Sequence, residues 1–316
     1  MHLVVDTDTG IDDALALMLL ASLPDVEIVA VTTTHGNCST EQSTANAGRV
    51  LAACGLGHVP VTGGLSAPLA GELSVAAVVH GGDGLGDCGE APPPAPPAPP
   101  GATAVDALLR LAHERPGELH LLALGPVTNL GAAVRVDPDV LGAFTSVTVM
   151  GGTGRRLAPG DTDPTLGVGD PNVYHDAEAA RLVAAARPRL TLVGVDVTMG
   201  VAAGPTHLER IAAATTDHGR LAHRITAFYV DFYERAYGRR ALTLHDPLAA
   251  TVAAGLDVSA TFVEGRAVVE GPPGAERCVI EPESPGARTA RALASCDAER
   301  VCELMTSALE KPLPVR

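Results

Sequence analysis

The sequence contains no tryptophan and one lysine, Lys311, and these two absences limit what a functional site can be built from. Without tryptophan, no indole ring is available to stack on a bound purine or another flat ligand. Because the lysine lies near the end of the chain, the body of the protein has none to act as a nucleophile or to hold a phosphoryl group.

Positive charge and long apolar runs are also scarce. The formal net charge is −15 at pH 7, which argues against nucleic acid or an anionic membrane as a partner because both attract basic surfaces. No run of roughly eighteen apolar residues is present, so no membrane span is expected. The N-terminal stretch contains acids and does not resemble a secretory signal. Six cysteines without CxxC spacing favour free thiols over zinc ligands, and we expect a cytoplasmic protein.

Strand-like and helix-like segments alternate along most of the chain. Runs of β-branched residues and leucine, typical of strands buried on both faces of a parallel sheet, occur at 3–6, 27–34, 119–124, 146–150 and 190–197. Helix-like segments lie at 12–22, 40–54, 103–114, 127–135 and 176–186. This alternation predicts an α/β fold with a mostly parallel, doubly wound, Rossmann-like sheet.

Three other segments depart from this alternation. A longer helical stretch is expected near 205–240, and 260–316 is expected to form a small strand pair and a closing helix. The proline-rich run within 90–101 predicts an exposed loop, because the alternation resumes unchanged after it. We therefore expect 1–316 to form a single domain.

Four aspartates lie within the first thirteen residues: Asp6, Asp8, Asp12 and Asp13. The apolar run before them predicts a strand that ends at Asp6 and Asp8, and Gly10 then turns the chain into a helix that begins near Asp12. Acids at a helix start complement the helix dipole, which accounts for one or two of the four. Four carboxylates this close repel one another unless a cation lies among them, and carboxylate oxygens suit Ca²⁺ or Mg²⁺. The segment therefore predicts a metal site.

Polar residues and glycines follow the predicted strands. These segments are Asp6-Thr7-Asp8, Thr34-His35-Gly36-Asn37, Gly125-Pro126-Val127-Thr128-Asn129 and Met150-Gly151-Gly152. Open parallel sheets bind ligands beyond the carboxyl ends of their strands. One edge of the sheet is therefore the predicted site. Gly125-Pro126 is either only a strand-to-helix turn or a place where a backbone carbonyl completes a calcium shell.

Two short motifs have both a structural and a functional interpretation. In His245-Asp246-Pro247, Asp246 before proline is typical of a helix N-cap, and it is equally a candidate metal ligand that joins the N-terminal acids. His245 is either a buried core histidine or a general acid. Asp170-Pro171-Asn172 is most simply a turn.

Taken together, these segments resemble the inosine-uridine-preferring nucleoside hydrolase family over nearly the whole chain. The resemblance is carried by Asp6 to Ala16, Thr33 to Asn37, His80-Gly81 with Gly84-Leu85-Gly86, Leu124 to Asn129, Met150 to Gly152, Asp170 to Ala180 and His245 to Pro247. It implies an α/β nucleoside hydrolase fold, a nucleoside substrate and a homodimer or homotetramer. The implied reaction is hydrolysis of the N-glycosidic bond, which gives free base and ribose.

The resemblance implies a role for individual residues at the metal. Ca²⁺ is held by Asp8, Asp13, Asp246 and the carbonyl of Leu124, with a water and two sugar hydroxyls. Asp8 also takes the proton from that water.

It also implies how substrate is bound. Asp12 and Asn172 bind the ribose 2′- and 3′-hydroxyls, and Asn37 lies near the scissile bond. Asp170 lies by the 5′-hydroxyl, and His245 faces the departing base.

The base itself has fewer candidates. His80 is placed among the substrate-binding residues by its motif. Tyr233 and Tyr237, just before His245, are the aromatic candidates for the base, and packing of both tyrosines in the core is the alternative.

The sequence departs from the family pattern in one region. Relatives usually carry Glu-Phe-Asn where this chain has Asp170-Pro171-Asn172, and they usually have an asparagine in the preceding loop. Here Arg155, Arg156, Asp161 and Asp163 occupy that loop. Recognition of the 5′ end of the sugar is therefore expected to differ.

Two other functions compete with this interpretation. Val5-Asp6-Thr7-Asp8 resembles the nucleophile motif of haloacid-dehalogenase-like phosphatases, in which Asp6 would attack a phosphoryl group. Such enzymes usually need a later lysine, and Lys311 near the end of the chain is a poor candidate for it. A calcium-stabilised protein that binds a nucleoside or sugar without turnover is the non-enzymatic alternative. The altered loop at 155–172 is the feature that supports it.

Overall fold

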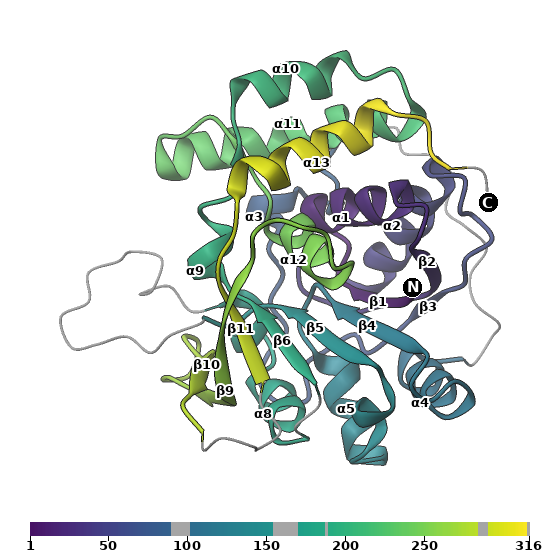
Figure 1. Ribbon diagram of the computed structural model, residues 1–316, viewed down its shortest axis with the longest axis vertical. Coiled ribbons are helices and arrows are strands. Elements are labelled where there is room, and N and C mark those ends of the chain that lie inside the picture. Colours follow the sequence, from purple (N-terminus) through teal and green to yellow (C-terminus); the bar gives the residue numbers. More distant parts are fainter. Residues whose placement is uncertain (90–101, 154–169, 187–188, 284–289, 315–316) are drawn as a thin grey trace.

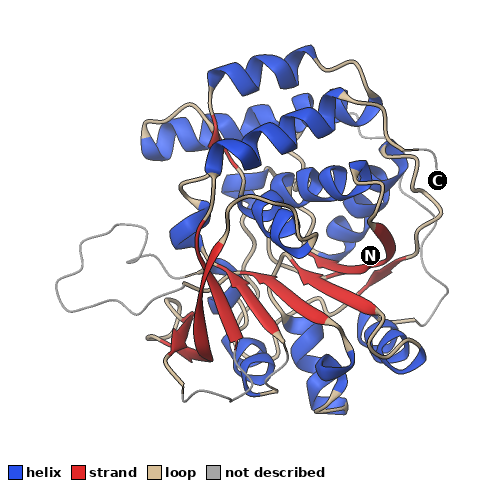
Figure 2. Cartoon of the chain, in the orientation of Figure 1, coloured by secondary structure: helices blue, strands red, loops and turns tan. Residues whose placement is uncertain are grey.

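A nine-stranded sheet organises the computed structural model, which describes the chain except residues 90–101, 154–169, 187–188, 284–289 and 315–316 (Figures 1 and 2). The strand order is β10-β9-β11-β6-β5-β4-β1-β2-β3. Their bounds are β1 His2–Thr7, β2 Glu27–Thr33, β3 Val61–Gly63, β4 Leu119–Ala123, β5 Ser146–Met150, β6 Leu190–Val193, β9 Thr261–Glu270, β10 Arg277–Glu281 and β11 Ala290–Ser295. The strands from β11 to β3 are parallel, and β9 runs antiparallel to both of its neighbours.

Helices cover both faces of the sheet, as a doubly wound fold requires. In Figure 1, α4, α5 and α8 lie on one face, and α1, α2 and α12 lie on the other beneath an outer layer of α10, α11 and α13. The bounds of the first group are α4 Ala104–Glu114, α5 Thr128–Val136 and α8 Ala177–Ala185, with the 3-10 turn η1 Val140–Ala143 after α5. Those of the second group are α1 Ile11–Ser22, α2 Thr40–Ala53, α10 Pro205–Ala213, α11 Asp217–Tyr237, α12 His245–Ala253 and α13 Ala298–Glu310. The predicted α/β class and its mostly parallel sheet are confirmed.

Helix α1 lies at the centre of the larger core. Every residue from Ile11 to Ala21 is buried, and the helix packs against α2, α11, α12 and α13. Its sequence, which is apolar on all sides after the first turn, is what such a position requires. The two aspartates of that first turn are consequently held in a rigid, buried element.

The structure corrects the prediction of a strand over 190–197. Strand β6 ends at Val193, and residues Val195–Thr198 form a short helix, α9. The β-branched residues of this segment favoured a longer strand. Gly194 follows the strand as the N-cap of this helix, and an added Cβ there would overlap the carbonyl oxygen of Gly152, so the position requires glycine.

Other segments also differ in detail from the sequence prediction. The helical stretch near 205–240 is two helices, α10 and α11, and Thr216 caps the second by accepting from the backbone N–H of Gly219. The predicted C-terminal strand pair is β9 and β10, and β11 joins it to β6. None of the helices in the described ranges is long and apolar enough to cross a membrane.

The remaining short elements lie near the site. They are α3 Ala77–His80, α7 Pro171–Tyr174 and the two-residue strands β7 Ala202–Ala203 and β8 Leu242–Thr243, which pair with each other. The proline-rich run at 90–101 lies outside the described residues.

Candidate active site

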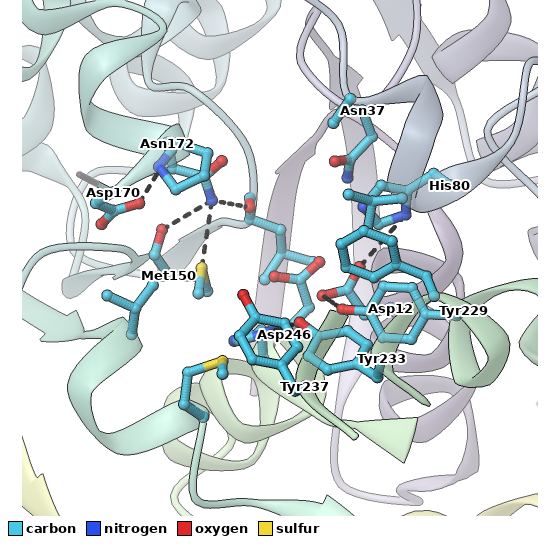
Figure 3. Close-up of a pocket in the computed structure, with 18 residues that line it drawn as sticks. Asp12, Asn37, His80, Met150, Asp170, Asn172, Tyr229, Tyr233, Tyr237 and Asp246 are labelled. Carbon is cyan, nitrogen blue, oxygen red and sulfur yellow. Dashed lines mark hydrogen bonds and ion pairs between the residues drawn. The ribbon is translucent and has the colours of Figure 1, made fainter. Parts of the chain in front are cut away.

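A cavity of about 300 Å³ opens beyond the carboxyl ends of the parallel strands (Figure 3). Its walls come from the strand ends, from α3, α7 and α11, and from the start of α12. In Figure 3, Asp170 and Asn172 lie on one side of the cavity and His80 and Tyr229 on the other, with Asp246 between them. The predicted edge of the sheet is thus where the structure places the cavity.

Four buried aspartates lie at the floor; Asp12 and Asp246 line the cavity, and Asp8 and Asp13 lie behind them. The exposed fractions are 2% for Asp8, 5% for Asp12, 0% for Asp13 and 3% for Asp246. Oxygens of Asp12, Asp13 and Asp246 lie within 4.8 Å of one another, a spacing that could hold a metal ion. The structure therefore brings the N-terminal acids together with an acid more than two hundred residues away in the sequence.

Asn37 connects Asp8 to the other acids by hydrogen bonds. Its backbone N–H donates to Asp8 Oδ2 at 2.8 Å, and its side-chain Nδ2 donates to Asp8 Oδ1 at 3.2 Å and to Asp13 Oδ2 at 2.9 Å. Gly36 precedes it with a φ of 149°, and an added Cβ there would overlap the Asp8 carboxylate. A residue without a side chain is therefore required for the chain to approach Asp8 this closely.

The first turn of α1 fixes Asp13 further. Its carboxylate accepts from the Gly10 backbone N–H at 2.8 Å and from the Thr7 hydroxyl. These bonds hold the carboxylate on the side of the helix that faces the cavity floor.

The electrostatics of the floor are those of a cation site. Burial, and after it the charge of Asp13, raises the pKa of Asp12 to about 7 and the pKa of Asp8 well above its usual range. Burial and the three neighbouring carboxylates likewise raise the pKa of Asp246. Within the described part of the chain, no lysine or arginine pairs with these acids, and Asp12 Oδ1 is buried without a hydrogen-bond partner. A hard divalent cation would neutralise this repulsion, and the free Asp12 oxygen is left to accept from a ligand.

The N-cap interpretation of Asp246 is wrong. Helix α12 already begins at His245, its N-cap residue is Leu244, and no side chain caps it. Asp246 lies in the first turn, where its carboxylate meets the acids of α1 rather than the free N–H groups of its own helix.

Asn172 lies opposite the acids and is oriented by two backbone carbonyls. Its Nδ2 donates to the carbonyl of Leu124 at 2.6 Å and to that of Met150 at 3.1 Å (Figure 3). Because the amide nitrogen is committed in this way, the amide oxygen is the atom left to meet a ligand. The Leu124 carbonyl was predicted to complete the metal shell. It lies just after β4 and is one of the two carbonyls that accept from Asn172.

Asp170 is more than the turn residue that its motif suggested. Its buried carboxylate caps α7 by accepting from the Asn172 N–H at 3.0 Å, and it also accepts from the Gly152 N–H. Burial raises its pKa to about 7 in spite of these bonds. The residue lines the cavity, while the predicted loop residues 155–163 lie outside the described residues.

His245 is held between two hydroxyl groups. Its Nδ1 lies 2.6 Å from Thr198 Oγ1 and its Nε2 lies 2.7 Å from the Tyr233 hydroxyl. Burial lowers its pKa to about 4, so the ring is neutral at pH 7. A neutral imidazole has one donor and one acceptor nitrogen, and therefore one hydroxyl accepts from the ring and the other donates to it.

Aromatic rings from one face of α11 form the wall next to His245. Tyr233 is 5% exposed and stacks on Tyr237 with ring centroids 5.3 Å apart, and Tyr237 is 55% exposed at the cavity mouth. Tyr229 donates to Asp12 at 3.4 Å and lies 5.4 Å from the ring of His80. The core-packing alternative is thus wrong for Tyr237, and Tyr233 is buried yet lines the cavity.

His80 lies between the acids and this wall. Its Nδ1 accepts from the Ile11 N–H at 3.1 Å and lies 3.9 Å from Asp12 Oδ1. Burial lowers its pKa well below the usual range.

Among the residues that sequence reasoning did not assign a role in the site are Thr198, Tyr229 and Phe232. Tyr229 lies four residues before Tyr233 and eight before Tyr237, so helical periodicity would have found it. Thr198 follows directly after a segment predicted as a strand, and the Met150 carbonyl carries no side-chain signal.

A family model described as inosine-uridine preferring nucleoside hydrolase matches residues 3–303. The chain belongs to this family. Uridine nucleosidase 1 of Arabidopsis thaliana is 34% identical over 247 residues, which cover 78% of this chain and 71% of the relative. The inosine-uridine preferring nucleoside hydrolase of Leishmania major is 34% identical over 252 residues, 78% of this chain and 76% of the relative.

Solved structures of nucleoside hydrolases share the fold over nearly their whole length. A plant nucleoside hydrolase superposes with a TM-score of 0.86 at 30% identity and covers 98% of this chain and 99% of its own. A purine-preferring ribonucleoside hydrolase from Gardnerella vaginalis gives 0.87 at 25% identity, with 98% of each chain covered.

Membership of the nucleoside hydrolase family makes this chain an N-glycosyl hydrolase. The phosphatase alternative fails on geometry as well, because Asp6, its candidate nucleophile, is 0% exposed and its Oδ1 accepts from Thr32 and Asn129.

Proposed function

We propose that this nucleoside hydrolase is a Ca²⁺-dependent N-ribohydrolase that converts a nucleoside into free base and ribose. The observation that carries the proposal is the floor of four buried carboxylates without a basic partner, facing Asn172 across the cavity. We further propose that it acts as one domain in cytoplasmic nucleoside salvage, as a homodimer or homotetramer, which light scattering of the purified protein tests.

The calcium would be held by Asp8, Asp13, Asp246 and the carbonyl of Leu124. All four donors are hard oxygens, and three are carboxylates whose mutual repulsion a divalent charge offsets. When bound, the cation orients the sugar diol and favours deprotonation of a water next to it.

Asp8 is the base in this proposal. It is fixed by both nitrogens of Asn37, so its position does not depend on the bound substrate. Its carboxylate takes a proton from the attacking water, and such a positioned base typically adds about 10²–10⁴-fold to the rate.

The sugar is bound between Asp12 and Asn172. Both residues present oxygen to the cavity, since Asp12 Oδ1 lacks a partner and the amide nitrogen of Asn172 is occupied. Oxygen acceptors match hydroxyl donors, so the pair suits the 2′- and 3′-hydroxyls of ribose. Carboxylates around the sugar also stabilise the positive charge that develops on it as the bond breaks.

The departing base gains negative charge and is met by His245. The imidazole and the hydroxyls of Tyr233 and Thr198 form a short hydrogen-bonded chain. To act as the acid, the neutral imidazole exchanges one of these hydroxyl partners for a nitrogen of the base and donates its N–H proton there. The hydroxyl on the other ring nitrogen passes a proton to the ring and regains one from solvent, so the leaving group is protonated without a charged histidine in the resting enzyme.

The role of His245 predicts a difference between substrates. His245→Ala should slow hydrolysis of nucleosides with poor leaving bases by about 10²-fold or more, while an activated aryl riboside should be affected far less. Comparison of kcat for the two substrate classes measures this. Tyr233→Phe should show the same preference in weaker form, and equal losses on both classes for His245→Ala would remove the acid role.

The whole proposal is tested by reducing-sugar release from purine and pyrimidine nucleosides with and without a calcium chelator. We expect release that the chelator abolishes and that added Ca²⁺ restores. Calcium and nucleoside binding by calorimetry without any release would instead favour the non-catalytic binding protein.

A further inference from the structure

One of the four N-terminal acids has no place in the mechanism above. Asp6 lies near the end of β1, two residues before Asp8, but it is fully buried and, unlike Asp8, does not interact with Asp12, Asp13 and Asp246 at the floor. One of its oxygens, Oδ2, is buried without a hydrogen-bond partner. A buried carboxylate that is only half satisfied lowers the stability of the fold, so its presence calls for a structural reason.

The other oxygen of Asp6 joins two neighbouring segments. Oδ1 accepts from the Thr32 hydroxyl at 2.5 Å and from Asn129 Nδ2 at 2.9 Å. Thr32 is the residue paired with Asp6 on β2, and Asn129 lies in the first turn of α5, just after β4.

Asn129 extends this connection. The same Nδ2 donates to the carbonyl of Thr33 at 3.0 Å, and the side-chain oxygen accepts from the Leu65 N–H at 3.1 Å. Gly64 allows the contact, because an added Cβ there would overlap the amide of Asn129. The pair Asp6–Asn129 therefore fixes the ends of β1 and β2 and the start of α5 relative to one another.

Each of these three segments adjoins, along the chain, either a proposed cation ligand or Asn37, which bonds the ligand Asp8. The backbone carbonyl of Asp6 accepts from the Leu124 N–H at 2.8 Å, which orients the adjoining chain that carries the Leu124 carbonyl. Two residues beyond Asp6 lies Asp8, and four beyond Thr33 lies Asn37.

We propose that Asp6 is a positioning residue for the cation site, which acts through its hydrogen bonds to Asn129 and Thr32 and not through its charge. The inference rests on the proposed calcium site. It predicts that hydrogen-bond acceptance by Asp6 Oδ1, rather than ionisation, determines how well the chain holds Ca²⁺.

Three variants test it, with the calcium dissociation constant measured by calorimetry on the full chain. Asp6→Ala should raise that constant by about 10- to 100-fold, as loss of a residue that orients metal ligands does. Asp6→Asn keeps an oxygen at Oδ1 for both donors and should bind calcium close to wild type. Asn129→Ala should resemble Asp6→Ala, and the double alanine variant should add little to either single change because both remove the same bond.

A matched control separates positioning from loss of stability. Leu141→Ala removes a buried side chain from η1, at the opposite end of the strands, and should lower the melting temperature without changing calcium affinity. Weakened binding in Asp6→Asn equal to that in Asp6→Ala would show that charge is what matters and would overturn the inference. Unchanged binding in folded Asp6→Ala would also overturn it, whereas a wild-type chain that binds no Ca²⁺ would refute the proposed function itself.

Discussion

Asp8→Asn should lower kcat for nucleoside hydrolysis by about 10²–10⁴-fold even at saturating calcium, because it removes the proposed base. Asparagine keeps the shape of the side chain, and its amide oxygen can still accept from the backbone N–H of Asn37, which donates to Asp8 at 2.8 Å. The fold and the path of the loop after β2 should therefore be retained. Steady-state kinetics with calcium varied independently of substrate would measure the loss.

Two measurements make that result specific to Asp8. Asp25→Asn, which removes an exposed carboxylate outside the site, should leave kcat unchanged. The calcium dissociation constant of Asp8→Asn sets the concentration needed for saturation. A variant that keeps more than about a tenth of wild-type kcat under those conditions would contradict a base that contributes at least 10²-fold.

The calcium-free protein should become less stable as pH rises from about 5 to about 8. Asp8, Asp12 and Asp246 have raised pKa values, about 7 for Asp12, so their protonated forms are favoured in the folded state. The stabilisation that these protonated carboxyls give the fold is fully present below their unfolded-state pKa near 3.8. It is lost as pH rises through their folded-state pKa, which is about 7 for Asp12. One pKa unit corresponds to about 1.4 kcal/mol, and a melting temperature lower by roughly 5 °C or more is expected.

Saturating calcium should remove this loss, because the cation stabilises the charged carboxylates. Melting curves with calcium and with a chelator should therefore separate increasingly toward higher pH. Other titrating groups, such as Asp6 and Asp170, contribute equally with calcium and with the chelator. Their contributions therefore cancel in the difference between the two melting temperatures. Asp246→Asn should flatten the calcium-free curve and abolish the separation, and parallel curves at all pH values would refute a cation among these acids.

The parts of the fold that the sequence predicted are those fixed by local patterns. The apolar run of β1, the turn at Gly10 and the acids at the start of α1 are contiguous, so alternation and composition were enough to place them. Strand β3, with three residues, and strand β11 were missed because pairing with β2, β6 and β9, rather than their own composition, holds them in the sheet.

The site shows the same division. Asp6 and Asp8 have the same local context, and only tertiary partners distinguish them: Asn129 and Thr32 surround the first, while Asn37 and the cavity floor surround the second. For Asp246, the adjacent proline favoured a cap, and the position of α12 beside α1 decided against it. Long-range packing thus assigns the roles among residues that sequence patterns had already identified as candidates.

The two halves of the cavity have separate origins. The acids and Asn172 come from the ends of strands and the short segments that follow them, whereas Tyr229, Phe232, Tyr233 and Tyr237 all come from one face of α11. In the proposed mechanism, the cation and the sugar are therefore bound by one set of segments and the base is met by α11, whose Tyr233 also bonds His245. We therefore expect exchanges at Phe232 and Tyr237, which bond none of the proposed catalytic residues, to change which base is accepted while hydrolysis itself is retained.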